Sequence, residues 1–108
     1  MAFDITTLIN GTIVEITLSG ELDANSAQRF RQELETIAPG KPTALVLRTA
    51  HLVYIASAGI RVLIFAKQKM GATVTVYMVA PQEQVLDTLR RTGLQNTIVV
   101  VDQYPAVP

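Results

Sequence analysis

One hydroxyl group, that of Ser57, lies where a predicted strand gives way to a predicted helix, and it is the main candidate for chemistry in the chain. The residues around it, Ala56, Ala58 and Gly59, are all small, so a second molecule can approach the backbone closely. Ser57 suits the N-cap position of the following helix, whose free N–H groups would favour negative charge beside it. The residues alone leave two roles open: a helix cap, or a site that a partner contacts.

A hydrolase nucleophile is the enzymatic alternative for Ser57. Ser-Ala-Gly is half of the Gly-x-Ser-x-Gly nucleophile elbow, and the strand-turn-helix context fits that motif. Position 55, however, is Ile rather than Gly, and nothing places an acid to orient His51, the single histidine. One histidine without any cysteine is also a poor set of metal ligands. We therefore predict a binding protein and not an enzyme, with no metal and no cofactor.

The composition argues against several classes of partner. Nine basic and nine acidic residues cancel, and no run of Lys or Arg marks a surface for nucleic acid or an anionic membrane. The absence of cysteine excludes a disulfide framework and fits a reducing compartment. The N-terminus lacks the basic start and apolar run of a signal peptide, and no apolar segment reaches the length of a membrane span. We expect a cytoplasmic protein whose partner is a protein or a small ligand, not nucleic acid or a membrane.

The elements before Ser57 begin with a hairpin and a helix. Asn10-Gly11 separates two β-prone segments, 3–9 and 12–18, and Gly20 is expected to end the second strand. A helix with one apolar stripe is predicted over 24–37. Either Asp23 or Asn25 can cap it, Asn25 with Gln28 as a capping-box partner, and the residues do not decide between them.

The remaining elements predict an α/β domain, with a mixed β-sheet and helices packed against it. The apolar run 44–47 reads as the central strand, and 48–55 leads from it to the turn at Ser57. After these, a helix is expected over 57–70, a strand over 73–79, a helix starting at Pro81 and closed by Gly93, and a last strand over 97–101.

The helix predicted over 57–70 has a polar side that includes an aromatic residue. Arg61 and Phe65 fall on that side, opposite an apolar stripe that includes Ile64. An exposed aromatic next to an arginine is typical of protein interfaces, so both residues are predicted to bind a partner. The alternative is that a loop or the C-terminal tail covers Phe65. Tyr54 is assigned to the core or its rim.

Two segments, Gly20-Glu21-Leu22-Asp23 and Ser57-Ala58-Gly59-Ile60, resemble the STAS domain family, in particular the bacterial anti-sigma factor antagonists. In that family a Gly-Glu-Leu-Asp segment follows the second strand, and Asp-Ser-Ser-Gly-Leu or Ser-Ser-Ala-Gly-Leu opens a helix after an apolar strand. The order of predicted elements also fits. The resemblance implies a single STAS-like domain over 1–102, followed by a short tail over 103–108.

This resemblance implies a partner-switching regulator. The dephosphorylated protein would bind a kinase-type anti-sigma factor, phosphorylation of Ser57 by that kinase would end the interaction, and a serine phosphatase would reset it. In the family the residue matching Asp23 lies close to the serine and contacts the partner. The expected partner-binding residues are thus Asp23, Ala56, Ser57, Ala58, Gly59, Arg61 and Phe65. The alternative is an unphosphorylated STAS docking subunit of another signalling or transport complex.

Two positions depart from the family pattern. Ala56 stands where the family usually has Asp or Ser, and Arg48 stands near where an Asp often ends the central strand. Both changes remove negative charge or a hydroxyl group from the expected contact surface, which leaves open a change of partner. They also leave open whether Arg48 or Arg61 pairs with a phosphate on Ser57.

Overall fold

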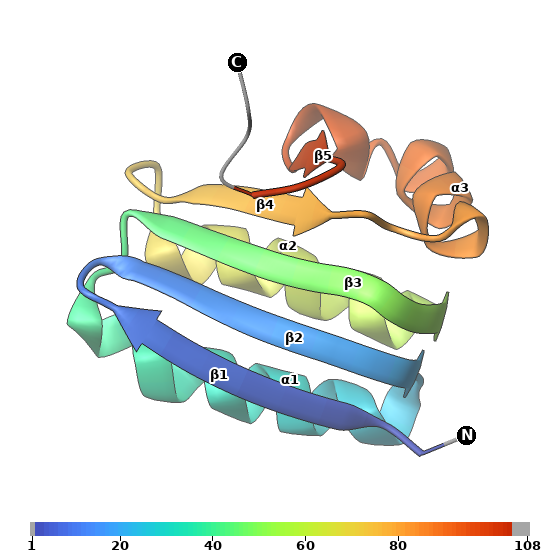
Figure 1. Ribbon diagram of the computed structural model, residues 1–108, viewed down its shortest axis with the longest axis horizontal. Coiled ribbons are helices and arrows are strands. Elements are labelled where there is room, and N and C mark those ends of the chain that lie inside the picture. Colours follow the sequence, from blue (N-terminus) through green and yellow to red (C-terminus); the bar gives the residue numbers. More distant parts are fainter. Residues whose placement is uncertain (1, 105–108) are drawn as a thin grey trace.

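The computed structural model describes residues 2–104 as a chain of alternating strands and helices (Figure 1). Its elements are β1 (Asp4–Asn10), β2 (Ile13–Leu22), α1 (Ala24–Ile37), β3 (Ala44–Ile55), α2 (Ser57–Met70), β4 (Thr75–Val79), α3 (Glu83–Thr92) and β5 (Val99–Val101). Short 3-10 turns follow α1 at Ala38–Gly40 and α3 at Leu94–Asn96. Both α1 and α2 have the bounds that the apolar periodicity predicts.

The strands form one sheet in the order β1-β2-β3-β4-β5. β1 pairs antiparallel with β2, and the other neighbouring strands pair in parallel. β3 therefore occupies the centre, as its apolar run Ala44–Leu47 predicts, and all four residues of that run are buried. The predicted α/β fold with a mixed sheet is confirmed.

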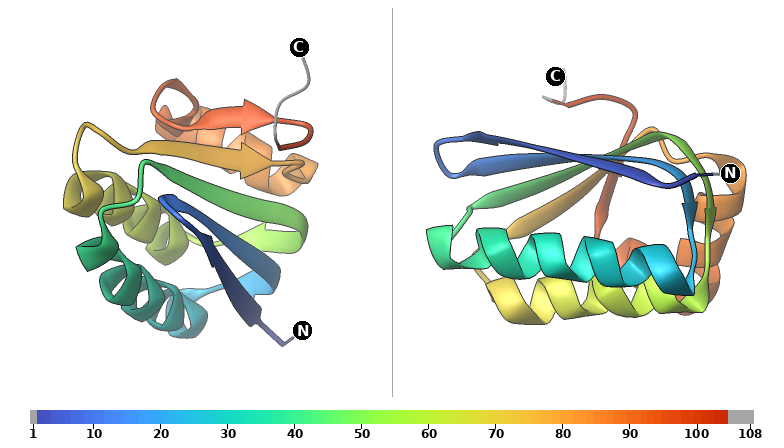
Figure 2. Two further views of the ribbon diagram at one scale, coloured as in Figure 1. Left: turned by 60° about the vertical axis from the view of Figure 1, so that its left-hand side comes forward. Right: turned by 90° about the horizontal axis from the view of Figure 1, so that it is seen from below.

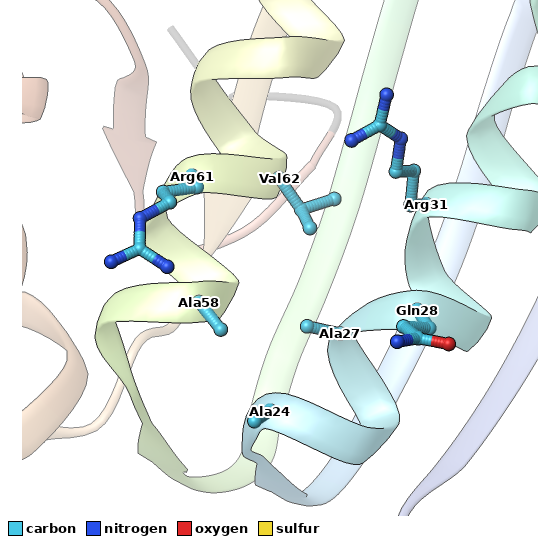
Figure 3. Close-up of a pocket in the computed structure, with 7 residues that line it drawn as sticks. All are labelled: Ala24, Ala27, Gln28, Arg31, Ala58, Arg61 and Val62. Carbon is cyan, nitrogen blue, oxygen red and sulfur yellow. The ribbon is translucent and has the colours of Figure 1, made fainter.

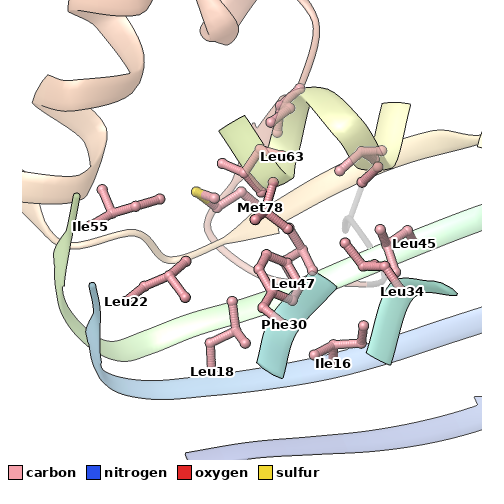
Figure 4. Close-up of a cluster of buried hydrophobic side chains, with 14 of the residues drawn as sticks. Ile16, Leu18, Leu22, Phe30, Leu34, Leu45, Leu47, Ile55, Leu63 and Met78 are labelled. Carbon is pink, nitrogen blue, oxygen red and sulfur yellow. The ribbon is translucent and has the colours of Figure 1, made fainter. Parts of the chain in front are cut away.

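Helices α1 and α2 lie side by side under one face of the sheet (Figure 2). Alternate residues of β2 and β3 point into the space between, because successive strand residues face opposite sides. Phe30 of α1 and Leu63 of α2 meet them there (Figure 4). The predicted stripe of α1 is buried throughout: Ala27, Phe30, Leu34 and Ile37. This layer fixes how the starts of the two helices stand against the sheet.

Strand β2 continues through Gly20 to Leu22, so the prediction that Gly20 ends it is wrong. Gly20 has φ +87°, a conformation that residues with a side chain rarely adopt, and the pairing with β3 shifts register beside it. A Cβ atom at Gly20 would lie 1.8 Å from the carbonyl oxygen of Ala2. The glycine thus lets the strand bend past the N-terminal segment and stay paired to its end.

Several other boundaries differ from the predictions. The hairpin turn is formed by Gly11 and Thr12, because Asn10 still pairs with Ile13. β3 runs without a break to Ile55, so the approach to Ser57 is a strand. α3 begins at Glu83 with Gln82 as its N-cap, not at Pro81. The expected strands 73–79 and 97–101 are shorter, at Thr75–Val79 and Val99–Val101.

The predicted C-terminal tail is described only as far as Tyr104. The Tyr104 ring lies 5.0 Å from that of Tyr77, between ring centroids, and its carbonyl oxygen accepts a 3.1 Å hydrogen bond from Arg48. Residues 105–108 of that tail lie outside the described part of the chain.

Candidate functional site

Two turns, one after β2 and one after β3, meet at the same end of the sheet. The last residues of the two strands, Leu22 and Ile55, are paired, and the N–H of Ala56 donates a 2.9 Å hydrogen bond to the carbonyl oxygen of Leu22. This bond sets the starts of α1 and α2 side by side. Asp23 and Ser57, which lie far apart in the sequence, therefore belong to one surface.

Asp23 is the N-cap of α1, which decides between the two predicted caps. Its carboxylate accepts 3.0 Å hydrogen bonds from the N–H groups of Asn25 and Ser26, while the Ser26 hydroxyl accepts one of 2.8 Å from the N–H of Asp23. That hydroxyl also donates to the carbonyl oxygen of Glu21 at 2.8 Å. The backbone N–H of Ser26, and then its hydroxyl, hold the pKa of the exposed Asp23 carboxyl below its usual value.

Sequence reasoning missed Ser26, and a broader capping-box pattern could have found it. It is buried at the third position after the cap, where Ser replaces the usual Glu or Gln.

Ser57 is not the N-cap of α2, contrary to the prediction. The cap is Ala56, which has extended backbone angles (φ −88°, ψ 170°), and no side chain caps this helix. Ser57 is the first helical residue, and its exposed hydroxyl makes no hydrogen bond with another residue of the described chain, 2–104. The cap position depends on where the backbone leaves the strand, and here it leaves at Ala56. The hydroxyl group is thus free to react or to be contacted.

The small residues around Ser57 do different jobs. Ala56 and Ala58 are half-buried, but Gly59 is buried. A Cβ atom at Gly59 would lie 2.8 Å from Cγ1 of Ile55 and 2.9 Å from Leu22 side-chain atoms, closer than packed atoms come. Gly59 therefore lets the first turn of α2 pack against the ends of β2 and β3. This packing alone accounts for a glycine at position 59, without contact to a partner protein.

A cleft of about 450 Å³ opens beside Ser57, between the start of α2 and helix α3. Gln84 on α3 closes its inner side, where its side-chain oxygen accepts a 3.1 Å hydrogen bond from the N–H of Ile55. Arg91 lies at the rim and pairs with Asp87 at 3.2 Å. Tyr54 also lines the cleft and is exposed, although the sequence placed it in the core or at its rim.

A second hollow, the α1–α2 groove, has a volume of about 240 Å³. It is lined by Ala24, Ala27, Gln28, Arg31, Ala58, Arg61 and Val62 (Figure 3). The two helices start beside each other, and alanines face each other across the gap. Their small side chains leave the hollow between the helices open. Because Ala58 directly follows Ser57, the groove adjoins the candidate serine.

Phe65 does not point outward among polar residues, as the helical wheel predicts. It is half-buried and packs against the core, and the guanidinium of Arg31 lies 4.2 Å from the centre of its ring. Within residues 2–104, Phe65 is thus covered by Arg31 of α1. Ile64, assigned to the apolar stripe, is instead 40% exposed. Arg61 is exposed, as expected.

Arg48 and His51 lie in β3 and not beside Ser57. Arg48 forms a 2.7 Å ion pair with Glu15 on the sheet. At a rise of about 3.3 Å per residue, its eight-residue separation from Ala56 corresponds to roughly 26 Å along the strand. Arg48 is therefore too far away to pair with a phosphate on Ser57. His51 is an exposed strand residue.

Within residues 2–104, no three His, Asp or Glu side chains are grouped so that they could hold a metal ion. In the same part of the chain, none of the helices has the length and apolar character needed to cross a membrane.

Comparisons with known proteins agree with this geometry. The model of the STAS domain matches residues 4–107. The anti-sigma-F factor antagonist RsfB of Mycobacterium tuberculosis is 26% identical over 88 residues, which cover 82% of this chain and 71% of RsfB. The crystal structure of an anti-sigma factor antagonist from Mycobacterium paratuberculosis superposes with a TM-score of 0.86 at 20% identity, covering 95% of this chain and 88% of that one. Bacillus SpoIIAA in its phosphorylated form has a TM-score of 0.71 at 20% identity, covering 92% and 90%.

Proposed function

The chain belongs to the STAS domain family, and on that premise we propose that it is an anti-sigma factor antagonist, a partner-switching regulator and not an enzyme. Its similarity to RsfB over most of both chains supports this assignment. The partner would be a kinase-type anti-sigma factor, which binds the dephosphorylated protein and phosphorylates it. A serine phosphatase would restore the binding form.

The observation that carries the proposal is the state of Ser57. Its hydroxyl is exposed at the start of α2, has no hydrogen bond within residues 2–104, and serves no capping role. A phosphoryl acceptor must be reachable by the kinase and must not be needed for the fold, and Ser57 meets both conditions. Asp23 stands on the same surface, as the Leu22–Ala56 hydrogen bond requires.

The fold is suited to keep a phosphate at this place. A phosphoserine carries a charge of about −1.5 to −2, and it would sit at the N-terminus of α2, where the helix dipole favours negative charge by about 0.3 to 1 kcal/mol. No acidic residue lies in the first turn of α2 to oppose it. A protein of similar fold, SpoIIAA, has been solved in a phosphorylated form.

In the complex the same charge would be unfavourable. The proposed contact surface consists of Asp23, Ala56, Ser57, Ala58 and Arg61, with Gly59 packed beneath it and Phe65 at its edge under Arg31. A partner fitted to the small Ala56 and Ala58 would bury the phosphate without supplying a counter-charge of its own, and burying a charge that the partner does not compensate costs several kcal/mol. Each 1.4 kcal/mol corresponds to tenfold in affinity, so a modest net penalty releases the partner.

The test is to incubate the protein with ATP and each histidine-kinase-like anti-sigma factor of the same genome, and then to map phosphate by mass spectrometry. We expect phosphate on Ser57 in the wild type and none in Ser57→Ala. Affinity should be unchanged in that variant and at least tenfold weaker in the phosphorylated protein. Circular dichroism serves as the folding control.

Two outcomes would contradict the proposal. Equal affinity of the phosphorylated and unmodified forms would exclude the switch. A stable complex in which Ser57 is never modified would instead indicate the docking subunit of another signalling or transport complex.

A further inference from the structure

The α1–α2 groove carries two arginines whose positive charges are largely unpaired within residues 2–104. Arg61 makes no ion pair with any residue in that range, and Arg31 has only a 4.0 Å pairing with Glu35. No carboxylate is among the residues that line the groove. Arg31 is also held in place over the Phe65 ring, at 4.2 Å.

We propose that Arg61 is a counter-ion used in both states of the protein. In the unmodified protein it binds a carboxylate of the protein partner seated in the α1–α2 groove. After phosphorylation it binds the phosphate on Ser57 instead. This inference rests on the proposed function and adds the chemistry by which the switch acts.

The groove fits an acidic protein segment. Its floor is made by Ala24, Ala27 and Ala58, so a partner backbone can approach closely, and Ala27 and Ala58 face each other across it (Figure 3). A guanidinium group binds a carboxylate through two parallel hydrogen bonds, which makes arginine the suitable side chain for this contact. In Figure 3 the guanidinium of Arg61 extends on the side of α2 that faces away from α1. A partner segment that binds it from the groove must therefore cross over the first turns of α2, where Ala58 leaves room.

The phosphate would compete for Arg61 because of its place on the same helix. Ser57 and Arg61 are four residues apart on α2, so their side chains lie on one face, and an acid N-terminal to a base is the favourable order. Arg61 has no other partner to give up within residues 2–104, whereas Arg91, across the cleft, is bound to Asp87 at 3.2 Å. Glu21, Asp23 and Tyr54 are other titratable residues at this end of the sheet, and none of the three carries a positive charge.

One guanidinium cannot pair fully with both acids. Once the phosphate holds Arg61, the partner's carboxylate loses its counter-ion and faces an added negative charge nearby. Phosphorylation would then weaken binding by withdrawing Arg61 from the partner's carboxylate and by placing the phosphate close to that carboxylate.

The first experiment compares the affinity of the unmodified wild type, Arg61→Gln and Lys69→Gln for the anti-sigma factor. Lys69 is exposed on the same helix and does not line the groove, so its variant loses the same charge at another place. We expect Arg61→Gln to bind roughly threefold to tenfold more weakly at low salt, with the difference shrinking at high salt, and Lys69→Gln to bind within about twofold of the wild type. Equal affinities of wild type and Arg61→Gln, or equal losses in both variants, would overturn the docking role.

The second experiment needs no partner. Phosphoserine is incorporated at position 57 of the otherwise wild-type protein and of the Arg61→Gln, Lys69→Gln and Arg91→Gln variants. The second pKa of the phosphate, ordinarily about 6, is then measured in each protein by phosphorus NMR. We expect this pKa to be lowest with Arg61 present and to rise in Arg61→Gln but not in Lys69→Gln. A rise only in Arg91→Gln, or no difference, would overturn the phosphate role. If no anti-sigma factor binds the wild type, both the proposed function and the docking role of Arg61 are contradicted. The NMR measurement still tests, independently, whether Arg61 pairs with the phosphate.

Discussion

Two turns lead from a strand into a helix at the same end of the sheet, one at Asp23 and one at Ala56. At the first, Asp23 and Ser26 satisfy each other's backbone N–H groups, and the Ser26 hydroxyl reaches back to Glu21. At the second, no side chain caps the helix, and the Ser57 hydroxyl bonds to nothing within residues 2–104. The two turns are nevertheless joined by the hydrogen bond from Ala56 to Leu22.

The difference shows that a helix start can do without a cap when packing holds it. The uncapped turn is fixed by Gly59 against Ile55 and by Gln84, which accepts a hydrogen bond from the N–H of Ile55. The capped turn is fixed by its own side chains. Holding the second turn through its neighbours leaves the serine hydroxyl accessible, which a regulated modification site requires.

The largest expected effect is that of Gly59→Ala. The new methyl group would press on Ile55 and Leu22, and overpacking of this kind typically costs about 1 to 3 kcal/mol. Urea unfolding measures the loss, and Gly40→Ala is the control because a Cβ atom there meets nothing within 4 Å. A Gly59→Ala protein as stable as the wild type would show that the uncapped turn is not held by this contact.

Ser26→Ala should come next, because it removes half of the capping box from the first turn. The variant loses the bonds to the Asp23 N–H and to the Glu21 carbonyl oxygen, so we expect a loss of about 1 to 2 kcal/mol in the free energy of unfolding. The matched comparison is the same substitution at Ser57. Equal losses at the two serines would remove the contrast between the turns.

The capped turn should also respond to acid. In the folded state the pKa of Asp23 lies below its usual value, so the ionised carboxylate stabilises the fold above the unfolded pKa, and this contribution is lost as the pH falls through the folded pKa. Asp23→Asn keeps an oxygen for the cap but not the charge. The stability difference between wild type and this variant should thus shrink from about pH 6 to about pH 3. Thermal melts across that range test it, and a constant difference would contradict it.

The smallest effect is expected for Ser57→Ala. No hydrogen bond within residues 2–104 is lost, and alanine is the better helix former, so the free energy of unfolding should change by no more than about 0.5 kcal/mol. Urea unfolding of the pair Ser57→Ala and Ser26→Ala measures the contrast directly. A loss above about 1 kcal/mol would mean that Ser57 has a structural role after all.

The local pattern of the sequence determined the order of the elements and the bounds of α1 and α2. The stripe from Ala27 to Ile37 repeats at helical spacing, and the apolar run Ala44–Leu47 marks the central strand, so both can be read within one segment. The candidate site was predicted in the same way, from small residues around one hydroxyl group and from the two segments that resemble the STAS family.

Only the tertiary structure decided what the side chains of the site do. Ala56 became the cap because β3 stays paired with β2 to its last residue, and Phe65 became covered because α1 brings Arg31 over its ring. Arg48 lies far from Ser57 because β3 stays extended and paired with β2 up to Ile55, and its side chain pairs with Glu15 of β2. Each outcome depends on a contact between segments far apart in the sequence, and hydrophobic periodicity within one segment carries no information about which residue of another segment will face it.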